Sequence, residues 1–189
     1  TFSGFTNRDG FESGSNTPAV FTIEPDPQEG FWVGTQWGGT YRLTHQKQRP
    51  VLTPASPHKN YVRQISPDEN GTLWLGTSSG LYNLADGALN KVLERSWILA
   101  LTRDERGRLW FGQGWNGGGA SRFDPVTGAW NEVPVPGYYG AGWCGRGIGA
   151  DLVGNVWVAL HTLSWTGGAV SRLNATTLTS TGTWDIGGQ

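Results

Sequence analysis

Three tryptophans stand in glycine-rich segments, where flat rings can recognise a ligand. They are Trp37 in TQWGGT, Trp115 in QGWNGGG and Trp165 in LSWTGGA. An indole ring flanked by Gly can stack on the face of a sugar or of another flat group. The other interpretation is that these rings fold inward and fill gaps between neighbouring structural units. The sequence leaves both interpretations open.

Two arginines, Arg63 and Arg146, occupy the same place in their segments, five residues before an Asp. A guanidinium group binds a carboxylate or a sulfate through paired N–H donors, so both are candidates for holding an acidic ligand. Ordinary pairing with acidic neighbours is the interpretation that we favour. Four aromatic residues lie in links that we expect on the same surface, and they complete the predicted ligand-binding set: Tyr61, Tyr138, Tyr139 and Trp143.

His161, in ALHTLSW, is the one histidine beside a Trp-bearing segment, and it is the single candidate for a catalytic group. A lone His is more often structural. The chain contains no Ser-His-Asp order, no pair of carboxylates at catalytic spacing and no phosphate-binding loop. Its Asp-x-x-Gly segments lack the further carboxylates that a Ca²⁺ loop requires. We therefore expect ligand binding without catalysis, without a cofactor and without a metal.

The composition excludes several classes of protein. The 189 residues carry a net charge of −1 and only three Lys, which argues against a nucleic-acid surface. No apolar stretch is long enough to span a membrane. A single Cys excludes an internal disulfide. The chain has no Met, even at position 1, and no signal peptide, so we expect a processed or excised piece of a longer protein.

A short pattern recurs four times and indicates a repeat protein. Each copy has an Asp six residues before a Trp: DPQEGFW, DENGTLW, DERGRLW and DLVGNVW, beginning at Asp26, Asp68, Asp104 and Asp151. The Trp residues are 42, 36 and 47 residues apart. Such a period is typical of a supersecondary unit that must stack on its neighbours to bury its faces.

Each repeat reads as four short strands. An apolar run precedes the Asp turn, the Trp strand follows it, and a third strand ends in YRL, YNL, SRF or SRL. A weaker fourth strand follows, as in LNKVL. The turn Gly stands at Gly71, Gly107 and Gly154, but in the first copy it is displaced to Gly30, so we expect that turn to differ. Four antiparallel strands per repeat predict an all-β chain of β-propeller blades.

The segment DENGTLWLGTSSGLYNL resembles the two-component regulator propeller repeat, and FTNRDGFESGSNTPAVFTI resembles the linker between such repeats. The segment GRGIGADLVGNVWVALHT is closer to the repeats of streptogramin (virginiamycin B) lyase. The first resemblance implies a bacterial sensor domain, periplasmic or extracellular, some members of which recognise oligosaccharides. The second implies an enzyme that uses His and Glu around a magnesium ion. His161 is the one residue that could correspond to the His of such an enzyme, but no matching His-x-Glu pair lies nearby.

We predict one propeller domain over residues 1–189, with blades at about 17–56, 57–95, 96–136 and 145–187. Residues 1–6 form an extra outer strand of a preceding or closing blade. Four blades leave two terminal faces open, so we expect completion by a second copy, which gives an eight-bladed homodimer, or by missing blades of a parent chain. A closed four-bladed ring is the remaining alternative.

Three functions remain open. The first, which we favour, is a non-catalytic ligand-binding or sensor module that uses its aromatic-rich face, with an oligosaccharide or another small molecule as the expected ligand. The second is a metal-dependent enzyme of the lyase-like branch. The third is a structural or engineered half-propeller that assembles without a ligand. The sequence does not identify the ligand.

Overall fold

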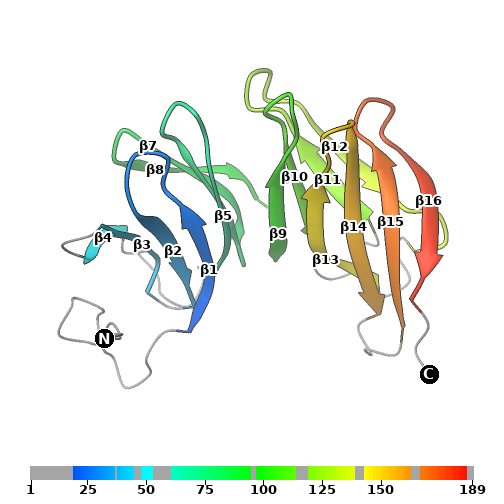
Figure 1. Ribbon diagram of the computed structural model, residues 1–189, viewed down its shortest axis with the longest axis horizontal. Helices are drawn as coiled ribbons and strands as arrows, with labels where there is room; N and C mark the ends of the chain where they lie inside the picture. The colour runs from blue at the N-terminus through cyan, green and yellow to red at the C-terminus, as the bar shows by residue number, and fades with distance from the viewer. Residues whose placement is uncertain are drawn as a thin grey trace. The chain divides into compact units, whose positions relative to one another are not determined.

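The computed structural model describes residues 19–36, 38–44, 48–52, 61–94, 97–113, 119–138, 143–162 and 167–186. The chain divides into two compact units, Thr1–Arg95 and Ser96–Gln189, and each is described by itself. The secondary structure of the described residues consists of short strands (Figure 1). Among these residues no helix is long and apolar enough to cross a membrane.

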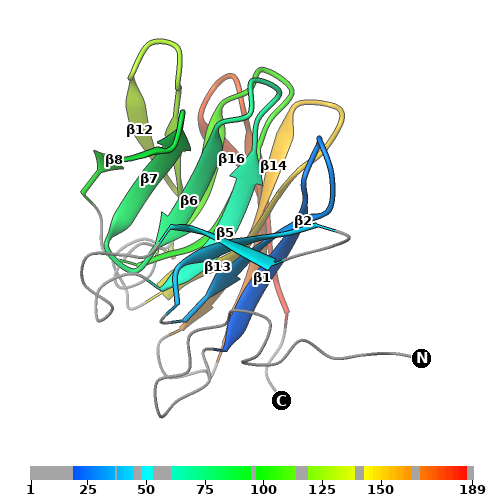
Figure 2. The same cartoon turned by 90° about the vertical axis from the view of Figure 1, so that its left-hand side faces the viewer.

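The first unit contains two four-stranded antiparallel sheets. In each sheet the strands lie in chain order, so every strand pairs with the one that follows it. Figure 2 shows β5, β6, β7 and β8 of the second sheet side by side. The first blade comprises β1 (Val20–Pro25), β2 (Phe31–Thr35), β3 (Thr40–Leu43) and β4 (Gln48–Leu52). The second blade comprises β5 (Val62–Pro67), β6 (Leu73–Thr77), β7 (Gly80–Ala85) and β8 (Ala88–Leu93).

The second unit repeats this arrangement, again with consecutive antiparallel strands. The third blade comprises β9 (Ile98–Arg103), β10 (Leu109–Gln113), β11 (Gly119–Phe123) and β12 (Trp130–Pro134). The fourth blade comprises β13 (Trp143–Ala150), β14 (Asn155–Thr162), β15 (Gly168–Asn174) and β16 (Thr179–Asp185).

The predicted fold class, an all-β chain of four-stranded antiparallel blades, is confirmed by these four sheets. The strands fall within the predicted blade ranges, except that β13 begins at Trp143, two residues before the expected boundary. The extra strand at residues 1–6 lies outside the described residues. The assignment of the whole chain to one domain stays a prediction.

The repeated Asp closes the hairpin between the first two strands of each blade. Its backbone N–H donates to the carbonyl oxygen four residues later, at 2.9–3.0 Å in all four copies. Its Oδ1 accepts backbone N–H groups of the same turn, such as Asn70 and Thr72 on Asp68. Gly30, Gly71, Gly107 and Gly154 have φ between 75° and 84°, a region that favours Gly. The displaced Gly30 therefore still provides the left-handed residue, one position later than in the other turns.

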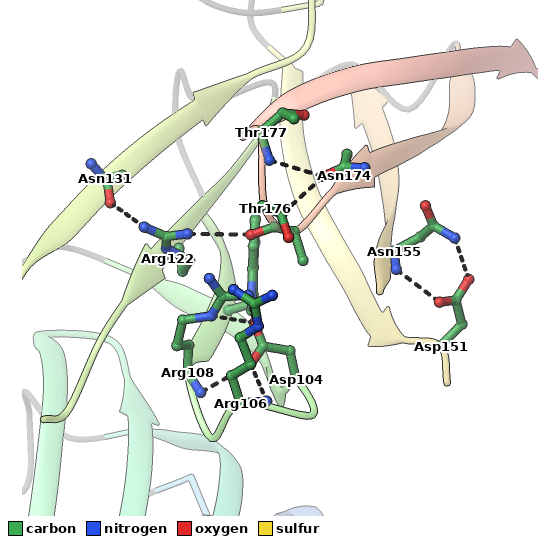
Figure 3. Close-up of polar contacts among 12 residues, drawn as sticks. Asp104, Arg106, Arg108, Arg122, Asn131, Asp151, Asn155, Asn174, Thr176 and Thr177 are labelled. Atoms are coloured by element: carbon green, nitrogen blue, oxygen red, sulfur yellow. Dashed lines mark hydrogen bonds and ion pairs between the residues drawn. The ribbon is translucent and has the colours of Figure 1, made fainter. Parts of the chain in front are cut away.

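The same Asp also holds the signature Trp of its repeat. Asp104 Oδ2 accepts the indole Nε1–H of Trp110 and the Nε–H of Arg108, both at 2.8 Å. All three of these side chains are buried, so each charge or polar group needs its partner. Figure 3 shows Arg108 and the backbone of Arg106 directed at the Asp104 carboxylate. The turn, the ion pair and the core Trp of the third blade thus form one network.

The fourth blade has a related arrangement. Asp151 accepts the side-chain and backbone N–H groups of Asn155, at 2.9 and 2.8 Å (Figure 3). It also accepts Trp157 Nε1–H at 3.0 Å. Hydrogen bonds from Asn155, followed by the bond from Trp157, hold the pKa of the Asp151 carboxyl well below its ordinary value because they favour the ionised form. The carboxylate is therefore a permanent acceptor in this turn at neutral pH.

Candidate ligand-binding surface

The first strand of every blade has an irregular register at one equivalent position. The pairing shifts between Val20 and Thr22 in β1, between Val62 and Gln64 in β5, and between Gly145 and Gly147 in β13. In β9, Ala100 pairs with Gly112 and Ile98 with Gln113, so one residue is again left over. A bulge bends the strand and redirects a side chain. The redirected residues are Phe21, Arg63, Leu99 and Arg146, the position that carries the two candidate arginines.

In the first unit the side chains at this position, Phe21 of the first blade and Arg63 of the second, contact each other. The guanidinium carbon of Arg63 in β5 lies 4.2 Å from the centroid of the Phe21 ring in β1 and 5.6 Å from that of Tyr61. The two rings are 6.2 Å apart and meet edge to face at 60°. Phe21 is exposed, and Tyr61 and Arg63 are half-buried. We call Phe21, Tyr61 and Arg63 the cation–aromatic cluster.

Backbone bonds place this cluster at the edge of the sheet where the turns between second and third strands lie. Tyr61 N–H donates to Ser78 Oγ at 3.2 Å, and Ser78 N–H donates to the Tyr61 carbonyl at 3.1 Å. In the first blade, Gln36 N–H donates to the Ala19 carbonyl at 2.8 Å. The beginnings of β1 and β5 are thus tied to the turns that follow β2 and β6. Tyr61 and Arg63 thus lie close together at this edge, and their role in ligand binding stays a prediction.

In the second unit, Arg146 contacts His161 on the adjacent strand. Arg146 Nε donates to His161 Nε2 at 2.7 Å, so that ring nitrogen carries no proton and the other nitrogen does. While this bond persists, His161 Nε2 can neither ligate a metal nor accept a proton from a substrate. The role of His161 in catalysis stays a prediction. The favoured pairing of Arg63 and Arg146 with acidic neighbours stays a prediction.

Tyr138 also has a specific partner. Its hydroxyl donates to Asp185 at the end of β16, and this bond raises the pKa of Tyr138 because the donated proton is harder to remove. The contact links the turn after the third blade to the outer strand of the fourth. A ligand that uses the Tyr138 hydroxyl has to compete with this carboxylate.

The remaining predicted residues are not tested by the described part of the chain. Trp37, Trp115, Trp165 and Tyr139 lie outside the described residues, and for Trp143 only its backbone in β13 is described. Their assignment to a ligand-binding surface stays a prediction.

Sequence reasoning missed a small cavity on the opposite edge of the first unit. It has a volume of about 110 Å³ and lies between the Asp26 and Asp68 turns, lined among others by Gln28, Trp32 and Arg42. Arg42 forms an ion pair with Asp26. Local sequence patterns do not indicate this cavity, because residues of two separate turns line it. Because its two aspartates already accept bonds from their own turns or from Arg42, we assign it no ligand.

Comparison with known proteins confirms the expected resemblance for one repeat. The family model described as "Two component regulator propeller" matches residues 56–79, which contain the Asp68 turn and the Trp74 strand. No curated protein sequence matches the chain at a significant level.

Solved structures confirm the fold over most of the chain. An auxiliary nutrient binding protein from Bacteroides thetaiotaomicron has a TM-score of 0.67 and 16% identity, over 90% of this chain and 42% of that one. An extracellular domain assigned to a hybrid two-component system of B. thetaiotaomicron has a TM-score of 0.65 and 19% identity, over 94% and 24%. A streptogramin B lyase has a TM-score of 0.63 and 14% identity, over 89% and 54%. The chain thus spans about a quarter to about half of these proteins, and at such identities the similarity establishes the fold alone.

Proposed function

We propose that the chain is a non-catalytic ligand-binding module of a sensor propeller, and that it binds an acidic carbohydrate at the cation–aromatic cluster. The observation that carries the proposal is the contact of one guanidinium with two rings: Arg63 lies 4.2 Å from the centroid of Phe21 and 5.6 Å from that of Tyr61, at a redirected position of the strand. Such an arrangement offers apolar faces and a fixed positive charge at one place.

The chemistry of the cluster suits a sugar that carries a carboxylate or a sulfate. Aromatic faces stack on the C–H face of a pyranose ring, and each contributes about 0.5–1.5 kcal/mol beyond its buried area. A guanidinium stacked on rings is held in one orientation, and its planar N–H edge matches the two oxygens of an acidic group. The ligand gains from both contacts only if it combines an apolar ring face with a negative charge.

The biological setting that we propose is drawn by analogy with similar structures. One is a nutrient binding protein and another is an extracellular domain of a two-component system. We infer by analogy that this chain also lies outside the cytoplasm and reports on a ligand there. The extracytoplasmic location and the sensing role rest on that similarity, whereas the ligand class rests on the cluster.

A glycan array tests the ligand class. The array should include oligosaccharides with uronic acid or sulfate groups together with neutral oligosaccharides of the same backbone. We expect binding to the acidic members and at least tenfold weaker binding to their neutral counterparts. The Arg63→Gln variant should lose this preference. Arg106→Gln, at an exposed turn position of the other unit, is the matched control and should bind as the native chain does. Equal binding of neutral and acidic members would contradict the proposal.

A further inference from the structure

The fourth blade places a guanidinium against an imidazole. Arg146 of β13 and His161 of β14 lie on neighbouring strands (Figure 1). Arg146 Nε donates to His161 Nε2 at 2.7 Å. A guanidinium has no acceptor atom and stays charged throughout the pH range of folded proteins. The bond therefore requires a neutral imidazole whose Nε2 carries no proton.

Acid removes the acceptor of this bond. An imidazole usually takes up its second ring proton near about pH 6.5, and both ring nitrogens are then donors. Arg146 and protonated His161 would thus bring N–H donors and two positive charges to one place. Like charges in contact repel each other, and an anion that accepts hydrogen bonds from both groups relieves the repulsion.

The pairing of an arginine with a titratable group is specific to the fourth repeat. The position four residues after the signature Trp holds His161 in this repeat and Ser78 in the second. Arg63, the equivalent of Arg146, therefore has a hydroxyl group at the position where Arg146 has an imidazole. The equivalent first-strand residues of the other two repeats are uncharged, Phe21 and Leu99. Only the fourth repeat combines a permanent cation with a group that becomes a cation in acid.

Small residues leave room around the pair. Arg146 stands between Gly145 and Gly147, at the register shift of β13. A Cβ placed on Gly147 would meet Ala159 Cβ at 3.4 Å and no other atom within 4 Å. Arg146 and Ala159 are exposed, and His161 is half-buried. Within the second unit, a small ion can therefore approach both groups from solvent.

The other titratable and charged groups near the pair are few. The strands packed against β13 and β14 carry three charged side chains, each toward the edge where the Asp turns lie: Arg103 in β9, Arg122 in β11 and Arg172 in β15. Asp185 of β16 lies at the same edge as His161 but two strands away, and its carboxylate accepts the Tyr138 hydroxyl. Cys144 pairs with His161 across the strands, and an ordinary thiol is protonated below about pH 7.5. Of these groups, His161 is the one expected to gain a charge between neutral pH and mild acid.

We propose that Arg146 and His161 form a binding site for a small oxyanion, and that protonation of His161 activates the site. At neutral pH the Arg146 Nε–H is engaged by the imidazole, so an anion is held weakly. In mild acid the guanidinium and the imidazolium both donate to one sulfate, phosphate or carboxylate group. This site is distinct from the cation–aromatic cluster of the first unit, because the charge of Arg63 does not depend on pH in this range.

Sulfate titrations at about pH 5.5 and about pH 7.5, on either side of the usual imidazole titration, test the site. The backbone amide signal of Gly147 in NMR spectra reports binding. Sulfate stays a dianion over this range, unlike phosphate, so a change in affinity comes from the protein. We expect binding to be at least about fivefold tighter in acid, because the imidazolium has then formed. The amide of Gln64, beside Arg63, is the internal control, and any response there should be independent of pH.

Methyl sulfate is the second probe and distinguishes the source of the anion. It carries the same group on an organic substituent. Acid-dependent binding as tight as that of sulfate would assign the site to a sulfate group on a larger molecule, and much weaker binding would assign it to a free ion. Failure of both probes to bind in acid would overturn the proposal.

Three variants assign the effect to the pair. Arg146→Gln should lose the tight binding in acid, and His161→Gln should bind sulfate equally weakly at both pH values. His161→Lys carries a fixed charge at this position and should bind tightly at both. A sulfate affinity of the native chain that does not depend on pH would overturn the proposal. A pH dependence that persists in His161→Gln, or that appears equally at Gln64, would overturn it as well.

Discussion

The indole Nε1 of Trp110 donates to Asp104 Oδ2 at 2.8 Å, and this bond explains why six residues separate Asp and Trp in the repeat. One carboxylate oxygen closes the turn while the other holds the Trp of the following strand. Trp74 with Asp68, at 3.3 Å, and Trp157 with Asp151, at 3.0 Å, repeat the pairing. In the first blade, Arg42 Nε donates to the equivalent oxygen, Asp26 Oδ2. The pattern therefore encodes a link between hairpin and core.

Replacing Trp110 by Ala should destabilise the protein strongly. The side chain is fully buried, so its removal leaves a cavity and costs about 3–5 kcal/mol of unfolding free energy. Chemical denaturation followed by tryptophan fluorescence and circular dichroism measures this loss. Trp130→Ala in the same blade removes an exposed ring and is the control, with a smaller expected loss. Equal losses for the two variants would contradict the role given to Trp110.

Stability should depend on pH through Asp151. Its pKa in the folded chain lies below the ordinary value of about 3.9, so its contribution is complete above about pH 5. As the pH falls through about 4, the unfolded chain takes up the proton first and the contribution is lost. The difference in melting temperature between the native chain and Asp151→Asn should therefore shrink from pH 6 toward about pH 3.

Asn155→Ala is the matched variant for this pH dependence. It keeps the Asp151 carboxyl group but removes the side-chain donor that lowers its pKa most. Its melting curve should lie between those of the native chain and Asp151→Asn at neutral pH. A difference between native chain and Asp151→Asn that stays constant over the whole pH range would refute the assigned role.

Gly112→Ala should weaken the packing of the third blade on the fourth. The added methyl carbon would lie 2.4 Å from the backbone oxygen of Gly145, which cannot rotate away as a side chain can. Overpacking of this kind costs about 1–3 kcal/mol. Gly149→Ala is the control, because a Cβ there meets no atom within 4 Å. Thermal unfolding of the two variants should separate them, and a neutral Gly112→Ala would argue against the close approach.

The sequence predicted the blades because their signals are local. Asp-x-x-Gly turns, strand alternation and the six-residue spacing act within one hairpin, so Asp68 and Trp74 could be placed without knowledge of the fold. Contacts between hairpins were harder to predict. Phe21 meets Arg63 across two blades, and Arg146 meets His161 through a bulge that the local pattern does not reveal. These two contacts were therefore not predicted from the sequence, and the favoured pairing of both arginines with carboxylates stays a prediction.

The predicted ligand-binding set stays a prediction for a related reason. Tyr61 directly precedes β5 and Arg63 lies at its register shift, and the structure places the two side chains close together. Trp37, Trp115 and Trp165 stand in turns of variable length, where spacing determines no position. Their side chains lie outside the described residues, so stacking and packing between blades both remain predictions for them.

The central claim is that Arg63 and its aromatic neighbours act as one binding unit, and a double-mutant cycle tests it most directly. The acidic oligosaccharide selected on the array is titrated by calorimetry into the native chain, Tyr61→Leu, Arg63→Gln and the double variant. We expect each single change to weaken binding at least tenfold, and the double variant to lose less than the product of the two, because the ring orients the guanidinium. Native affinity in Arg63→Gln would contradict the claim.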